Sequence, residues 1–200
     1  MYVLIAKFGP GTESASGSDT VPLQHWKYLN QDNRLGTVRL LGALNFYTDK
    51  APWEYGYTVT ERRNNGSPED RTTKYDDVDT LFWSILSNPP DILHTHTRGK
   101  KLVELARELK RNGTRLVHTV HGMDSLDDGY DRHLLRLADV VTSPTAYACR
   151  RISARDGGRY ASKTHQLPNS TDFTDYKWDP FVNARADEIR NQYNAHGGRI

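Results

Sequence analysis

Short apolar runs alternate with helix-forming patterns along most of this 200-residue chain, and this alternation is its most constraining feature. Strand-like runs are expected at residues 2–6, 37–44, 91–96, 116–120 and 163–167. Apolar residues at helical spacing predict helices over residues 78–86, 102–109, 134–138 and 145–152. Strands that alternate with helices build βαβ units. The sequence therefore predicts an α/β fold, a Rossmann-like parallel sheet with helices on both faces.

The regions outside this alternation are polar or rich in glycine. Residues 9–18 are rich in glycine and serine and are expected to form a loop. Asp19 or Thr20 is then expected to cap a short helix with Pro22 in its first turn. A hairpin is expected around residues 55–61, followed by a polar loop over residues 64–68. Ligands of parallel sheets bind at the carboxyl ends of the strands, which here points to residues 9–18, 95–99, 121–128 and 143–145.

Charge and cysteine content exclude several classes of protein. The chain has 27 basic and 25 acidic side chains, a near-balance that gives no footprint for nucleic acid. Its one cysteine cannot form an internal disulfide, which fits a reducing compartment. No stretch approaches the roughly 18 apolar residues of a membrane span, and the apolar start has no basic region or cleavage site of a signal peptide. We expect a soluble cytoplasmic protein.

Four segments between residues 91 and 176 resemble the N-terminal domain of the family 4 glycosyltransferases, which have the GT-B fold. They are DILHTH at 91–96, LVHTVHG at 116–122, ADVV at 138–141 followed by Thr145, and LPNSTD at 167–172 followed by Tyr176. Ser170 stands where the family prefers glycine. Ser16-Gly17-Ser18 is the nearest match to the glycine pair that the family places before its first long helix.

The resemblance implies transfer of a sugar from a nucleotide diphosphate sugar to a hydroxyl acceptor, with retention at the anomeric carbon. It implies no cofactor besides the nucleotide sugar as co-substrate. Residues 1–180 are expected to form the acceptor-side domain. Residues 181–200 are expected to form a connecting helix and the start of an absent C-terminal donor-binding domain.

Such a chain is a fragment of a longer protein, one half that pairs with a separate donor-binding subunit, or a remnant. We expect little or no transfer by the chain alone. Glu61 and Glu69 have the E-x7-E spacing of the family's donor motif, but they lie in a polar region, and coincidence explains them better.

His121 is the predicted catalytic residue, because the resemblance places a histidine at this strand end in contact with the reacting groups. The predicted substrate-binding residues are Gly17, His96, Arg98, Gly122 and Thr145. Each has a plainer interpretation. His121 can simply end a strand, Gly17 can belong to a flexible loop, and Arg98 to a solvated helix start with Lys100 and Lys101. Thr145 is first of all a helix N-cap.

His94 and His96 are two residues apart on a strand and point to the same face. They form a feasible metal pair, with His121 as a third ligand on a neighbouring strand. We expect no metal, since no acidic residue is fixed near them. His96 is expected to line the acceptor pocket and His94 to pack below it.

Two other functions stay open from the sequence. The first is a non-catalytic sugar- or nucleotide-binding module or partner subunit with the same pocket. The second is a nicotinamide-dependent oxidoreductase. Its glycine fingerprint is weak, and Leu41-Gly42-Ala43 stands where an acidic residue is expected after the second strand.

Overall fold

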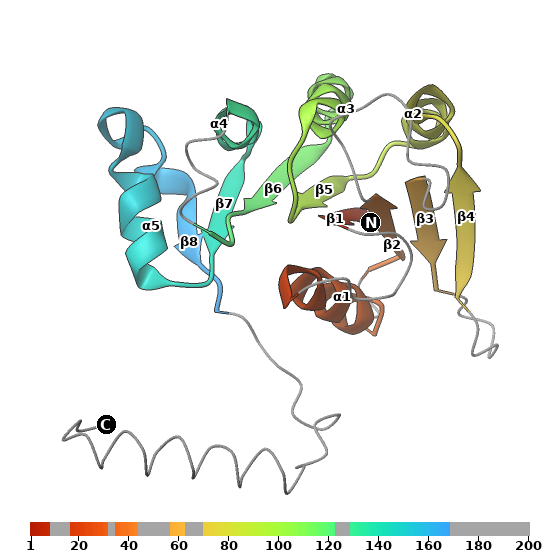
Figure 1. Ribbon diagram of the computed structural model, residues 1–200, viewed down its shortest axis with the longest axis horizontal. Helices are drawn as coiled ribbons and strands as arrows, with labels where there is room; N and C mark the ends of the chain where they lie inside the picture. Colours follow the sequence, from red (N-terminus) through yellow and green to blue (C-terminus); the bar gives the residue numbers. More distant parts are fainter. Residues whose placement is uncertain (9–16, 32–34, 44–56, 63–69, 123–128, 169–200) are drawn as a thin grey trace, which may run out of the picture. The chain divides into compact units, whose positions relative to one another are not determined.

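The computed structural model describes residues 1–8, 17–31, 35–43, 57–62, 70–122 and 129–168 (Figure 1). The chain divides into two compact units, Met1–Ser170 and Thr171–Ile200, and every described residue belongs to the first. The connecting helix and second domain start predicted for residues 181–200 lie outside the described residues.

An eight-stranded, mostly parallel sheet forms the centre of this unit. Its strands are β1 (Tyr2–Phe8), β2 (Thr37–Ala43), β3 (Tyr57–Glu61), β4 (Arg71–Tyr75), β5 (Ile92–Thr95), β6 (Arg115–Thr119), β7 (Val140–Ser143) and β8 (Thr164–Gln166). Their spatial order is β4-β3-β2-β1-β5-β6-β7-β8. The six strands from β2 to β8 in this order are parallel, and only β3 and β4 add antiparallel pairs. The predicted α/β Rossmann-like architecture is confirmed.

Helices cover both faces of the sheet. They are α1 (Gly17–Leu29), α2 (Val78–Leu86), α3 (Lys100–Arg111), α4 (Gly129–Leu137) and α5 (Ala146–Ser153). Figure 1 shows α1 on one side of the sheet and α2, α3 and α4 on the other. The order of the strands explains this. The chain adds β2 on one side of β1 and later adds β5 to β8 on the other side of β1. Right-handed crossovers in opposite directions place their helices on opposite faces.

Two apolar cores result from the side-chain alternation along the strands. In β1, Leu4 and Ala6 join the core under α2, α3 and α4, whereas Val3 and Ile5 join the core under α1 with Trp26. Complete burial of a leucine or isoleucine contributes about 1.5–3 kcal/mol. Both layers therefore stabilise the sheet.

The first helix differs from the prediction. It begins at Gly17, so Asp19 and Thr20 lie inside it and do not cap it, and Pro22 also lies within the helix. Pro22 is the sixth residue of the helix, beyond the first turn, so its ring removes one backbone bond of the helix.

Residues 57–61, where a hairpin was expected, form the single strand β3, which pairs with β4 (RTTKY), a segment that the sequence did not distinguish from a loop. The polar loop expected at residues 64–68 lies outside the described residues. None of the described helices has the length and apolar character needed to cross a membrane.

Candidate functional site

The point where the strand order reverses lies between β1 and β5, and two predicted site residues lie at this edge. His96 directly follows β5, and its backbone N–H donates to the carbonyl of Ala6 on β1 over 2.8 Å. His121 follows the neighbouring parallel strand β6. Nδ1 of His96 lies 2.9 Å from Nε2 of His121, so the two imidazoles are hydrogen-bonded. The structure thus brings together the predicted catalytic residue and one predicted substrate-binding residue.

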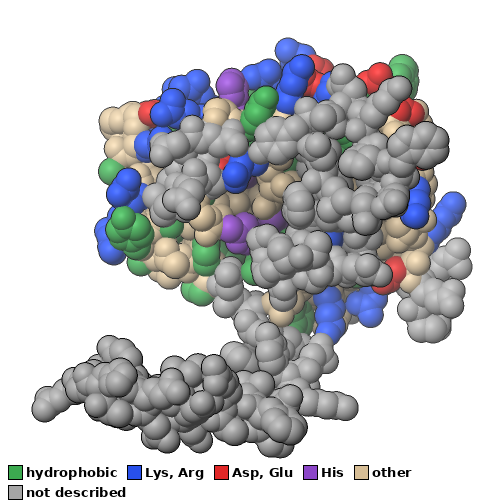
Figure 2. All heavy atoms as spheres, viewed as in Figure 1, with side chains coloured by type: hydrophobic (Ala, Val, Ile, Leu, Met, Phe, Trp, Pro, Cys, Tyr) green, Lys and Arg blue, Asp and Glu red, His purple; other side chains and the backbone are tan. Residues whose placement is uncertain are grey.

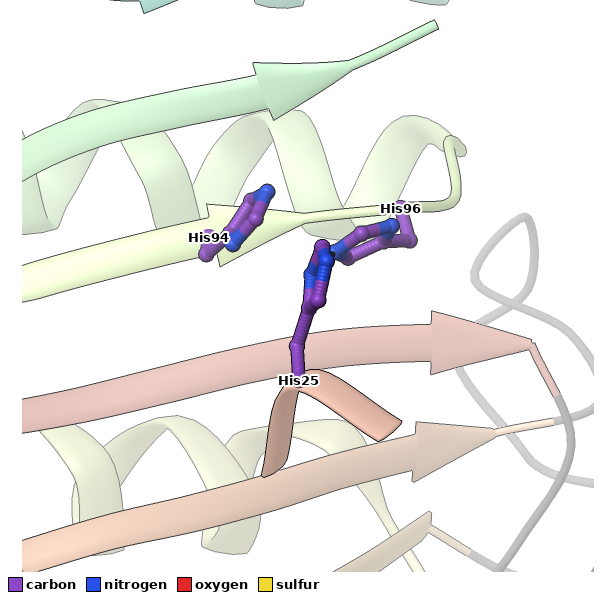
Figure 3. Close-up of side chains that lie close together, drawn as sticks. All are labelled: His25, His94 and His96. Carbon is purple, nitrogen blue, oxygen red and sulfur yellow. Dashed lines mark hydrogen bonds between the residues drawn. The ribbon is translucent and has the colours of Figure 1, made fainter. Parts of the chain in front are cut away.

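Two more histidines complete a cluster on the α1 side of the sheet. The ring of His94 lies 4.2 Å from that of His96, centroid to centroid. His25, on α1, stacks on His94 at 5.5 Å and places its Nδ1 3.4 Å from Nε2 of His96. Figure 3 shows His25 reaching from α1 toward His94 and His96 at the end of β5. We call His25, His94, His96 and His121 the histidine cluster.

The environment keeps the histidine cluster neutral at physiological pH. Burial, followed by the neighbouring histidines His25, His118 and His121, lowers the pKa of His94 to about 3. Burial and then His94 and His121 hold the pKa of His96 well below its ordinary value. Burial also lowers the pKa of His25 and His121. Each neutral ring therefore offers one N–H donor and one lone pair.

A hydroxyl chain anchors His94 from below. Its Nε2 lies 2.8 Å from Oγ1 of Thr119 on β6, and that oxygen lies 2.6 Å from Oγ1 of Thr142 on β7. His94 and His96 are each only 8% exposed. The prediction that His94 packs below His96 is consistent with this arrangement, but both rings are equally buried.

A second polar network lies on the opposite face, because Thr95 alternates with His94 and His96 along the strand. Oγ1 of Thr95 lies 2.7 Å from Nδ1 of His118, whose Nε2 is 3.2 Å from Oδ1 of the buried Asp131 on α4. Arg98 pairs with Oδ2 of Asp131 at 3.6 Å while its side chain remains 39% exposed. Arg98 thus ties the segment after β5 to α4.

The other predicted substrate-binding residues occupy different places. The Thr145 hydroxyl caps α5 by accepting from the Ala148 N–H at 3.1 Å, as its plainer interpretation predicted. Gly122 is exposed, and a Cβ there would meet nothing within 4 Å. Gly17 is the first residue of α1. Lys100 and Lys101 both pair with Glu104, but only Lys100 fits the solvated helix start, since the Lys101 side chain is mostly buried.

Two acidic residues of the predicted motifs have structural partners. Asp139, from the ADVV segment, accepts from Nζ of Lys110 with both oxygens at 2.7 Å and from the Leu116 N–H at 2.8 Å. Glu61 pairs with Arg39 at 3.0 Å, and Glu69 lies outside the described residues. Asp139 therefore joins α3 to the start of β6.

Sequence reasoning missed His25. The residue belongs to no motif, and its only signal is its position four residues after Val21 and four before Leu29, on an apolar face of α1. That spacing predicts an inward side chain but not which strand it meets. His118 and Asp131 were also missed: His118 lies within the LVHTVHG segment but was given no role, and Asp131 belongs to no motif.

A family model described as Glycosyltransferase Family 4 matches residues 42–175, more than half of the chain. The chain belongs to this family. No curated protein matches it. The family 4 match contains His94, His96 and His121 but begins after α1, so His25 lies outside it.

Proposed function

We propose that this family 4 chain is the acceptor-binding half of a retaining glycosyltransferase. The complete enzyme transfers a sugar from a nucleotide diphosphate sugar to a hydroxyl acceptor. The hydrogen-bonded His96–His121 pair carries the proposal, because it lies at the carboxyl edge of β5 and β6 beside the reversal of strand order.

His121 is the proposed catalytic residue, and His96 positions it. If Nδ1–H of His96 donates to Nε2 of His121, the Nδ1–H of His121 is a donor. A neutral imidazole in this tautomer can donate to charge that develops on the leaving phosphate or can orient the acceptor hydroxyl. Loss of such a donor costs on the order of 100-fold in turnover.

The remaining acceptor contacts are proposed for Gly17, Arg98, Gly122 and Thr145, which all lie at or near carboxyl ends of strands or at the start of α1. The partly exposed guanidinium of Arg98 suits an anionic group on the acceptor. The transfer needs no cofactor besides the nucleotide sugar. A second domain or a separate donor-binding subunit supplies the donor site, and the chain alone has little or no transfer activity.

The proposal is tested by titrating candidate acceptors into the 200-residue chain in metal-free buffer. Binding is monitored through the NMR signals of the histidine rings. The panel contains oligosaccharides, polyols, sugar phosphates and nucleotide sugars. We expect saturable shifts of His96 and His121 with a hydroxyl acceptor. His121→Ala should weaken that binding by about tenfold, the loss of one good hydrogen bond.

His165→Ala is the matched control, since His165 is exposed on β8, outside the histidine cluster. Its acceptor affinity should equal that of the wild type. Shifts that saturate only with nucleotide sugars would contradict the acceptor assignment and favour the non-catalytic nucleotide-binding module.

A further inference from the structure

We infer that the histidine cluster is a binding site for zinc, with His25, His94 and His96 as ligands and His121 orienting His96. Each of the three ligands offers one ring nitrogen, and these nitrogens all lie within 4.8 Å of one another. The three side chains converge from α1 and from the end of β5 (Figure 3). The inference does not rest on the proposed function, and the family match does not include His25.

The spacing of two ligand nitrogens already suits the ion. Tetrahedral zinc with Zn–N bonds of about 2.0–2.1 Å holds two ligand nitrogens about 3.3 Å apart. Nδ1 of His25 and Nε2 of His96 are 3.4 Å apart, which is longer than a typical hydrogen bond between nitrogens. The ligand nitrogen of His94 lies within 4.8 Å of the other two, so its ring must move by up to about 1.5 Å to complete the set.

The hydrogen bonds of His94 and His96 are compatible with the tautomers that a metal requires. Imidazoles that bind a metal donate their second N–H to an outer partner. Nε2 of His94 has Thr119 as this partner, which leaves the lone pair on Nδ1. Nδ1 of His96 has His121, which leaves the lone pair on Nε2, the nitrogen that lies nearest His25.

The donor set selects the class of cation. Neutral imidazoles suit zinc and its neighbours in the first transition row, whereas calcium and magnesium require oxygen ligands. Three protein ligands leave the fourth position of a tetrahedral ion to water or to an oxygen of a bound molecule. Figure 2 shows histidine side chains at the molecular surface, and within the histidine cluster His25 and His121 are half-buried.

Zinc binding is measured on the untagged 200-residue chain after removal of metals with a chelator. We expect one equivalent of zinc by competition with a chromophoric chelator, and cobalt at the same site with the visible spectrum of a tetrahedral complex. His25→Gln should weaken zinc binding by about 100-fold or more, because it removes a direct ligand, and His121→Ala by about tenfold, as an outer partner. His165→Gln should leave the affinity unchanged.

A measurement on the unmodified chain guards against a variant that fails to fold. One equivalent of zinc should shift the ring signals of His25, His94 and His96 together, while those of His133 and His165 stay in place. Absence of stoichiometric binding overturns the inference. Zinc shifts at His133 or His165 in place of the three ligands, or equal affinity in folded His25→Gln, overturn it as well, whereas a shift of His121 is expected because it bonds His96.

Discussion

Neighbouring residues at the carboxyl end of β5 take part in two separate polar networks. His94 and His96 face α1 and join the histidine cluster, whereas Thr95 faces α4 and bonds His118. Asp131 and Arg98 close the second network, so its histidine has partners on both ring nitrogens. The histidine cluster contains no acid among the described residues and retains nitrogens that can bind a ligand. This difference favours the α1 side for the ligand chemistry that we propose.

Asp139 belongs to one of the segments that resemble the family, and its structural role can be tested. Burial acts to raise its pKa, but hydrogen bonds from Lys110 and Leu116 and the charges of Lys110 and Arg115 outweigh it and lower the pKa. Asp139→Asn should lower the free energy of unfolding at pH 7 by about 1–3 kcal/mol, as expected for bonds to a charged group. Urea unfolding measures this loss.

The pH dependence of that loss has a defined sign. Because folding lowers the pKa of Asp139, its stabilisation is complete above about pH 4 and is lost as the pH falls through the folded-state pKa. The gap between wild type and Asp139→Asn should therefore shrink below pH 4. Asp70→Asn, at an exposed acid before β4, should show no gap. A gap for Asp139→Asn that stays constant down to pH 2 would refute this assignment.

Elements with local signals could be predicted from the sequence, and elements without them could not. The helix over residues 78–86 has a regular apolar spacing and an Asp77 cap, and it occurs at those residues. By contrast, β4 reads RTTKY, with its first four side chains exposed, and becomes a strand only by pairing with β3. α1 starts at Gly17, earlier than its polar residues indicate, and it packs on Val3 and Ile5 through Trp26.

The cap of α5 gives a prediction for one element. Thr145→Ala should lower the free energy of unfolding by about 1 kcal/mol, because the Ala148 N–H loses its side-chain acceptor. Thr145→Ser keeps the hydroxyl and should retain most of this stability. Chemical unfolding of the three proteins checks the order, and equal stability of Thr145→Ala and wild type would contradict the capping role.

The whole molecule gathers the site from segments far apart in the sequence. Parallel β5 and β6 align their carboxyl ends, so the proximity of His96 and His121 followed from the predicted strands alone. His25 joins the cluster only because α1 packs on the sheet face opposite to α2, α3 and α4. No local pattern of residues 17–29 specifies that face. The sequence therefore predicted half of the histidine cluster as a site and needed the tertiary structure for His25.

The central proposal, that this chain is the acceptor half of a retaining transferase, is tested most directly by a sugar-transfer assay. Nucleoside diphosphate release and glycosylated product are measured for the chain alone and for the chain with a donor-binding domain from the same or a neighbouring reading frame. We predict release at the uncatalysed level for the chain alone. With the donor-binding domain, we predict transfer with anomeric retention, reduced on the order of 100-fold by His121→Ala. Robust transfer by the chain alone, or unchanged turnover of His121→Ala in the complete enzyme, would contradict the account.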